Sequence, residues 1–216
     1  MTAVIPKKKK RDRILESSVP LFALRGYHGV SMRDIAAAIG LSPAALYYHF
    51  PDKEQLYIEV VAHAVRESPA MRKGIPNGLG SPWGRLEAFV AGYARLAATD
   101  RNFLRLLQWI FIDGDAERQQ KLAEYVFRDL FLDVWGIVCE LDSRLDPHML
   151  VISIIGLVLF PCQTSSINRF MPGYRPQLEI PEELARHVID LLFGCLDAGK
   201  GATGSQNVAG KPLLNG

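Results

Sequence analysis

The fold of this chain is decided by residues 31–50, SMRDIAAAIGLSPAALYYHF, which predict two short helices with a tight corner between them. Ser31 offers the hydroxyl of a helix N-cap, and Asp34 places a carboxylate in the first turn, where the helix dipole is positive. Gly40 is expected to end this helix, because glycine accepts the left-handed backbone that a helix C-terminus often needs. The first of the two helices therefore has a defined start and a defined end.

The second helix begins with a cap of its own. Ser42 can accept a hydrogen bond from a free backbone N–H, and Pro43 suits the first helical position because proline has no N–H there to leave unpaired. We predict a helix from Pro43 to about Phe50. Two helices around a glycine corner form the helix-turn-helix pattern, whose second helix enters the major groove of DNA. The alternative is an ordinary helical hairpin.

The outer face of this second helix favours DNA over the plain hairpin. Ala44 and Ala45 are small enough for the first turn to approach base edges, whereas Leu46 and Phe50, four residues apart, form the inward stripe. The side chains expected on the outside are Tyr47, Tyr48 and His49. Their O–H and N–H groups suit phosphate contacts better than a merely solvated face would require.

A many-point pattern extends from these helices over the first third of the chain. Its residues are 15–18 (LESS), 21–22 (LF), 26–27 (GY), 31–36 (SMRDIA), 40–42 (GLS), 46–50 (LYYHF) and 53–54 (KE). Together they resemble the N-terminal DNA-binding domain of TetR-type transcriptional regulators. Beyond about residue 67 the resemblance is only architectural.

The resemblance implies an all-α fold, with an N-terminal three-helix helix-turn-helix domain followed by a larger helical ligand-binding and dimerisation domain. It implies a ligand-responsive, sequence-specific repressor that binds a palindromic operator as a dimer and is released by a small apolar or aromatic molecule. The DNA-binding residues expected on this basis are Ser31, Arg33, Ser42, Pro43, Ala44, Ala45, Tyr47, Tyr48, His49 and Lys53.

Lys53 is singled out because a cation in the first turn of a helix opposes the dipole unless something negative lies nearby. DNA phosphate is the obvious candidate, and the resemblance assigns that role to the matching lysine. A solvated lysine that pairs with Glu54 or Asp52 is the alternative. Asp52 and Gln55 are spaced as the cap of this next helix.

A basic run, KKKKRDR at residues 7–13, stands just before the first predicted helix, which is expected from Arg13 to Arg25. The run favours an arm that follows the phosphate backbone or reaches a minor groove. A solvated tail or a nuclear-localisation signal would also fit such a run. Pro20 is expected to kink the first helix, because a mid-helix proline removes a hydrogen bond.

The composition of the 216 residues, 49% of them hydrophobic, predicts a soluble globular protein with a sizeable core. The longest apolar run, residues 149–162, is shorter than the about 20 residues of a bilayer span, and the N-terminus has no signal-peptide pattern. We therefore expect a cytoplasmic protein without membrane contact. The three cysteines, Cys139, Cys162 and Cys195, are expected to be reduced core residues; a thiol sensor or metal site lacks any CxxC or His/Cys spacing.

Composition and helical periodicity divide the chain into parts. Residues 1–67 are expected to form the DNA-binding domain, and the glycine- and proline-containing residues 68–82 a linker. Residues 82–198 are expected to form the second helical domain, in which residues 103–112 are apolar nearly all round and hence buried. Residues 199–216 have no periodicity and are predicted to be disordered.

The second domain is expected to carry two functions implied by the resemblance. Helices near 147–170 and 181–197 would form a four-helix homodimer interface with two-fold symmetry. The remaining helices would enclose an effector pocket, although for each of its residues taken alone ordinary core is the better interpretation, since aromatic residues at helical spacing usually form core. The candidate lining residues are Phe89, Tyr93, Phe103, Gln108, Trp109, Phe127 and Gln163.

Two other classes of function were compared with this one. An enzyme or small-molecule carrier would need a catalytic constellation, but the histidines are scattered and there is no GxSxG, HExxH or glycine-rich phosphate loop. We expect no catalytic residue, no metal and no cofactor. A DNA-binding protein without sequence preference would rely on the basic run and would lose affinity steeply with salt.

Overall fold

The computed structural model describes residues 7–66, 80–141 and 145–201, and every regular element in these ranges is helical. The predicted linker lies largely outside the described residues, as does most of the predicted disordered tail. The last helix runs to Gly201, so it continues past residue 198, where the tail was expected to begin. The all-α prediction is confirmed.

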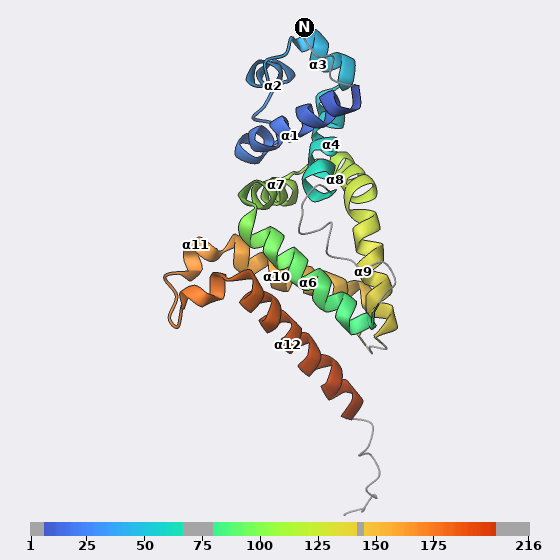
Figure 1. The fold of residues 1–216 in the computed structure, drawn as a ribbon, viewed down its shortest axis with the longest axis vertical. Coiled ribbons are helices and arrows are strands. Elements are labelled where there is room, and N and C mark those ends of the chain that lie inside the picture. Colours follow the sequence, from blue (N-terminus) through green and yellow to red (C-terminus); the bar gives the residue numbers. More distant parts are fainter. Residues whose placement is uncertain (1–6, 67–79, 142–144, 202–216) are drawn as a thin grey trace, which may run out of the picture.

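The first four helices pack as a small domain at one end of the molecule (Figure 1). They are α1 (Lys7–Arg25), α2 (Met32–Ala38), α3 (Pro43–His49) and α4 (Lys53–Arg66). Their shared core is sealed from solvent at Phe22, Ile35, Leu46, Phe50 and Tyr57. The rings of Phe22 and Tyr57 meet edge to face with their centroids 5.1 Å apart, which ties α1 to α4.

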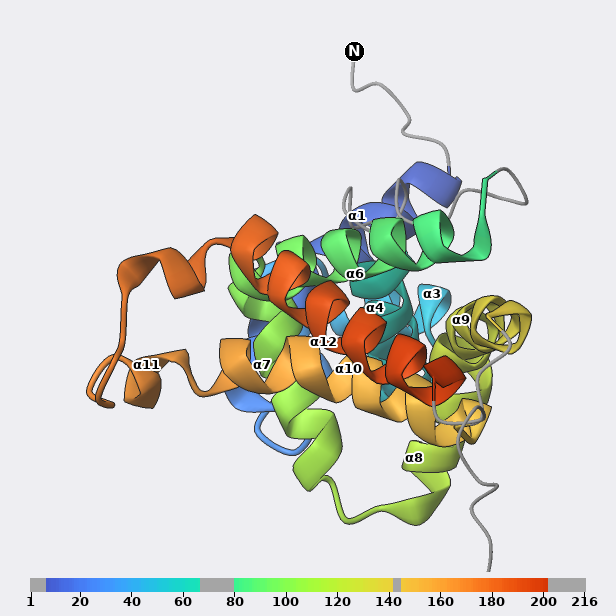
Figure 2. The ribbon, with the colours of Figure 1, turned by 90° about the horizontal axis from the view of Figure 1, so that it is seen from below.

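The remaining helices form the larger part of the molecule, in which α12 packs along α6, and α10 packs against both (Figures 1 and 2). The α-helices are α6 (Pro82–Thr99), α7 (Arg101–Ile112), α8 (Ala116–Leu122), α9 (Arg128–Glu140), α10 (Pro147–Gln163), α11 (Ser165–Asn168) and α12 (Pro181–Gly201). A π-helical segment, Ala123–Phe127, joins α8 to α9, and a 3-10 helix, Pro176–Glu179, precedes α12.

Two expectations about the helices need correction. The basic run is not a separate arm, because α1 begins at Lys7 and includes it. The helix α1 continues without interruption through Pro20, and the kink expected there stays a prediction. The helix α7 is not buried all round: Trp109, Phe111 and Ile112 are exposed to different extents, because only one side of α7 packs on the core.

The cysteines differ from the expectation of three core residues. Cys139 is exposed and Cys162 is half-buried, both as free thiols, whereas the side chain of Cys195 lies outside the described residues. Burial raises the pKa of the Cys162 thiol to about 11, so it stays protonated at neutral pH and is a weak nucleophile.

Candidate DNA-binding surface

The corner between α2 and α3 is fixed by the helix caps that the sequence predicts. Ser31 Oγ accepts a hydrogen bond from the Asp34 backbone N–H at 3.1 Å, and Asp34 Oδ2 accepts one from the Ser31 backbone N–H at 3.0 Å. The Ser31 hydroxyl also donates to Asp34 Oδ2 at 2.6 Å, and this bond, with the one from the Ser31 backbone N–H, lowers the pKa of Asp34. Gly40 takes a φ of +69° at the corner, and Ser42 Oγ then accepts from Ala45 N–H at 3.2 Å to start α3. The predicted boundaries of both helices are thus fixed by local bonds.

The outer face of α3 presents two tyrosines to solvent. Tyr47 is 50% exposed and Tyr48 is 70% exposed, while Leu46 on the opposite side is fully buried. The first turns of α3 and of the neighbouring α2 carry further exposed residues: Ser31, Arg33, Ser42, Pro43 and Ala44, with Ala45 half-buried. Eight of the ten predicted DNA-binding residues are therefore accessible to solvent, on α2 and α3 or at their N-caps.

His49 was predicted to lie outside, and this is wrong, because only 8% of it is exposed. A step of three residues from Leu46 returns to nearly the same side of a helix, so His49 shares the inward face with Leu46 and Phe50. Its ring lies 5.3 Å from the ring of Tyr48 in an edge-to-face arrangement. The buried ring of His49 therefore packs against the exposed Tyr48.

The side chain of Lys53 is half-buried, and its ammonium has partners within the protein. Its ammonium donates hydrogen bonds to the backbone oxygens of Tyr27, at 3.0 Å, and Val30, at 3.2 Å. The same nitrogen lies 4.1 Å from the centroid of the Tyr27 ring. Burial lowers the pKa of Lys53, and the charge of Arg118 lowers it further. The alternative of a lysine paired with Asp52 or Glu54 is not what the structure shows; the phosphate contact remains a prediction.

Arg11 is a structural residue that the basic-run interpretation missed. Its guanidinium forms an ion pair with Glu59 at 2.5 Å, donates to the backbone oxygen of His49 at 2.6 Å, and lies 4.3 Å from the centroid of the Phe50 ring. Arg11 thus fastens the C-terminal end of α3 to α1 and α4. Nothing in a run of cations distinguishes such a residue from its neighbours.

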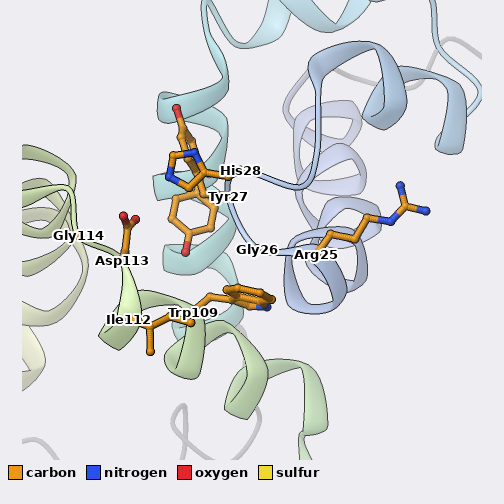
Figure 3. A pocket seen from close by; sticks show the side chains of 9 residues that line it. Arg25, Gly26, Tyr27, His28, Trp109, Ile112, Asp113 and Gly114 are labelled. Carbon is orange, nitrogen blue, oxygen red and sulfur yellow. The ribbon is translucent and has the colours of Figure 1, made fainter.

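A cavity of about 160 Å³ lies where the DNA-binding domain meets α7 (Figure 3). Trp109 crosses this joint: its Nε1 donates to the backbone oxygen of Ala23 at 3.2 Å, and its indole lies against Gly26. Trp109 was predicted to line the effector pocket, but it lines this joint instead. The lining residues are Arg25, Gly26, Tyr27, His28, Tyr57, Trp109, Ile112, Asp113 and Gly114.

The other candidate effector residues fall into two groups. Phe89, Tyr93 and Phe103 are buried together: the rings of Phe89 and Tyr93 stack at 5.8 Å, and those of Tyr93 and Phe103 meet edge to face at 6.4 Å. The half-buried Gln163 has a buried Nε2 that finds no hydrogen-bond partner within the described part of the chain. Gln108, by contrast, is exposed on α7.

Phe127 is half-buried at the end of the π-helical segment. The structure does not bring it into any ring contact with the aromatic cluster of α6 and α7 among the residues described. In the same ranges, no helix is both long and apolar enough to cross a bilayer, and no cluster of three metal-ligating side chains is found.

The sequence was compared with known proteins. Residues 14–60 match the family model described as bacterial regulatory proteins, tetR family. A relative is the biofilm operon icaADBC HTH-type negative transcriptional regulator IcaR of Staphylococcus epidermidis, 36% identical over 47 residues, which are 22% of this chain and 25% of that protein. The IcaR of Staphylococcus aureus is 37% identical over 51 residues. The chain therefore matches about a quarter of the length of these relatives.

Solved structures extend the likeness over most of the chain. FadR of Bacillus subtilis in complex with stearoyl-CoA superposes with a TM-score of 0.69 at 21% identity, over 85% of this chain and 97% of that one. AibR in complex with isovaleryl coenzyme A and operator DNA superposes with a TM-score of 0.62 at 25% identity, over 85% of this chain and 98% of that one. PfmR, a TetR family regulator from Thermus thermophilus, superposes with a TM-score of 0.62 at 25% sequence identity, over 89% of this chain and 96% of that one.

Proposed function

The chain belongs to the TetR family of bacterial regulatory proteins, and from this premise we propose that it is a repressor that binds a palindromic operator as a dimer and releases it when a small effector binds. This family is one of DNA-binding transcriptional regulators and not of enzymes. Because such a regulator acts on chromosomal DNA, the cytoplasm is its proposed location.

The observation that carries the operator-binding role is the outer face of α3. A short helix, capped at Ser42 and anchored by the buried Leu46 and Phe50, holds Tyr47 and Tyr48 outward at an accessible corner of the molecule. Phenolic O–H groups donate hydrogen bonds to phosphate oxygens, and the small Ala44 leaves room for the first turn to approach base edges. We therefore propose that Tyr47 and Tyr48 contact the phosphates and that the first turn of α3 contacts the bases.

The test is a titration of a duplex that the full-length protein selects from a random library. Tyr48→Ala should weaken binding about tenfold on all selected sequences, since it removes a hydrogen bond to a charged oxygen. Ala44→Ser should instead change which sequences are preferred. The matched control is Tyr125→Ala, because Tyr125 is also 70% exposed but lies on the π-helical segment.

Equal affinity of the parent and the Tyr48→Ala protein would contradict the assignment of this face. Competitor DNA separates specific from non-specific binding. A protein that binds every duplex equally, with affinity that falls steeply with salt, would be the non-specific binder considered as an alternative.

The proposed homodimer rests on an apolar face that this single chain leaves uncovered. Met149, Ile152 and Phe160 are exposed at spacings of three and eight residues, which puts them on one side of α10. Leu191 is exposed on α12, the neighbouring helix (Figure 2). Contiguous apolar surface of this kind marks an interaction site, and two-fold pairing of one face with its copy would cover it.

The proposed effector site is the buried cluster of Phe89, Tyr93 and Phe103, with Gln163 drawn from α10, the helix that packs against α6. A buried amide N–H without a partner costs free energy, so a ligand oxygen that accepts its hydrogen bond would stabilise the complex. The effector is proposed to be apolar or aromatic with such an oxygen. An acyl thioester meets this description, and FadR and AibR, with the same fold, were crystallised with acyl-CoA molecules.

The effector proposal is tested by adding stearoyl-CoA, isovaleryl-CoA or free coenzyme A to the protein bound to its selected duplex. Release by an acyl-CoA but not by free coenzyme A is expected, and Gln163→Leu should weaken that response. Gln177→Leu, an exposed residue of the 3-10 helix, is the control. No release by either acyl-CoA would exclude this class of effector and leave the operator-binding proposal standing.

A further inference from the structure

We propose that Arg118 is a positioning residue for operator binding: it holds the ring of Tyr27, and through that ring the ammonium of Lys53, in place from the regulatory domain. We name Asp113, Arg118, Tyr27 and Lys53 the Arg118 clasp. The inference rests on the proposed operator binding and deepens it, because it names the contact by which the two domains act on each other.

The clasp begins with a buried ion pair on the regulatory side. Arg118 Nε lies 2.6 Å from Asp113 Oδ2, and Arg118 Nη2 lies 2.7 Å from Asp113 Oδ1. The two side chains are only 3% and 6% exposed. A bidentate pair fixes the plane of the guanidinium, and water cannot readily replace it at this depth. Asp115, the N-cap of α8, adds a second carboxylate 3.4 Å from Arg118.

The guanidinium then reaches across to the DNA-binding domain. Its central carbon lies 3.8 Å from the centroid of the Tyr27 ring, and Arg118 Nη2 lies 3.4 Å from His28 Nε2. Tyr27 and His28 follow Gly26 in the turn between α1 and α2. A desolvated guanidinium over an aromatic face is an attractive cation–π contact, so α8 holds this turn by a directional interaction.

The turn that Arg118 holds in turn restrains Lys53, the first residue of α4. The Lys53 ammonium contacts the same Tyr27 ring and donates to the backbone oxygen of Tyr27. With the second bond, to Val30, two of its three N–H groups are used within the protein. The remaining N–H has no hydrogen-bond acceptor among the described residues, and we propose that it meets a phosphate in a direction set by where the Tyr27 turn is held.

Two further contacts make the joint resist independent motion of the domains. Lys121 on α8 forms an ion pair with Glu54, the residue that follows Lys53 on α4. Trp109 on α7 is bonded to Ala23 on α1, as described above. A movement of α7 or α8 on effector binding must either carry the DNA-binding domain with it or break the Arg118 clasp. Both results alter how Lys53 meets the operator.

The test is a double-mutant cycle in the full-length protein, with the selected duplex as ligand. Lys53→Gln should weaken binding about tenfold in the parent and reduce the salt slope, because a phosphate contact is lost. In the Arg118→Gln background the same change should cost less than about threefold, since Lys53 is then no longer held in position. Arg95→Gln, in the exposed pair with Glu182, is the control background, in which the cost should stay tenfold.

A second pair of variants keeps the test valid if Arg118→Gln unfolds. Tyr27→Phe retains the ring and should preserve the coupling to Lys53, whereas Tyr27→Leu should abolish it with the Asp113–Arg118 pair intact. A merely structural role for Arg118 would lower thermal stability but leave the cost of Lys53→Gln unchanged.

The two proposals fail in different ways. A parent protein that selects no duplex contradicts operator binding itself. A parent that binds, combined with a Lys53→Gln cost that is equal in all backgrounds or absent in the parent, overturns the Arg118 clasp alone.

Discussion

Gly26 occupies a position that no residue with a side chain could take without strain. Its φ is +66°, and a Cβ built there would lie 2.7 Å from Trp109 Cδ2. Two separate costs therefore fall on one residue: the left-handed backbone, and the displacement of an indole that is hydrogen-bonded to α1.

The first prediction compares Gly26→Ala with Gly40→Ala. Gly40 has a similar φ of +69°, but a Cβ there would meet nothing within 4 Å. Gly40→Ala should lower the free energy of unfolding by about 1 kcal/mol, the backbone cost alone, and Gly26→Ala by about 2–4 kcal/mol. Urea unfolding measures both values. Equal losses would show that the indole moves aside without cost.

The second prediction concerns acid stability and Asp113. Hydrogen bonding by Arg118 lowers the pKa of Asp113 below its unfolded value, so the carboxylate stabilises the fold at neutral pH. This contribution is lost as the pH falls through the folded pKa. Asp113→Asn should cost about 3 kcal/mol at pH 7, as for a broken buried pair. The difference from the parent should shrink in urea unfolding below about pH 4; a difference independent of pH would contradict this role.

His49 was misplaced although its spacing of three residues from Leu46 already puts it on the inward face of α3. Lys53 and Arg11 were misplaced for another reason: they are polar, and polarity alone places a residue outside. Their partners come from other segments: the backbone of Tyr27 and Val30 for Lys53, and Glu59 for Arg11. Such contacts depend on tertiary packing, which a single sequence does not contain. The exposed Tyr47 and Tyr48 were placed correctly, because a periodicity of 3.6 residues around Leu46 is enough to place them.

At the scale of the helix, the boundaries that carry a capping residue were predicted well. Ser31, Ser42 and Asp52 each accept a hydrogen bond from a backbone N–H three residues on. These bonds are local, so the sequence contains all of their partners. The start of α1 at Lys7 and the π-helical segment after α8 carry no such signal, and both were missed.

The third prediction tests the value of one such cap. Ser31→Ala should lower the free energy of unfolding by about 1 kcal/mol, because the Asp34 N–H and the Asp34 carboxylate both lose their partner hydroxyl. Ser166→Ala, at an exposed position within α11, should change it by less than about 0.5 kcal/mol. Thermal unfolding of both variants checks the contrast, and a similar loss from each would rule out a special role of the cap.

For the molecule as a whole, the uncovered apolar face of α10 predicts that two copies of the chain pair. The fourth prediction is that Ile152→Glu combined with Phe160→Glu converts the protein from dimer to monomer, because each buried carboxylate in a paired face would lack a partner. Light scattering after size-exclusion chromatography measures the mass. Phe111→Glu, at an exposed phenylalanine of α7, is the control and should leave the mass unchanged.

A parent protein that is already monomeric at micromolar concentration would contradict the homodimer directly. Loss of the dimer should also weaken operator binding strongly, because a monomer reaches only one half-site. The overall two-part architecture could be predicted, since the capped helices and their apolar stripes were visible. How the two parts meet could not, because Asp113, Arg118 and Tyr27 are brought together only by packing.

The indole of Trp109 gives the molecule an intrinsic fluorophore at the boundary between its two parts. It is partly exposed, and its N–H is bonded to a backbone oxygen of α1. Indole emission shifts to longer wavelength when water replaces such a neighbour. An unlabelled sample in which Trp83 and Trp135 are replaced by Phe would therefore report domain separation as a red shift, in real time and without a dye.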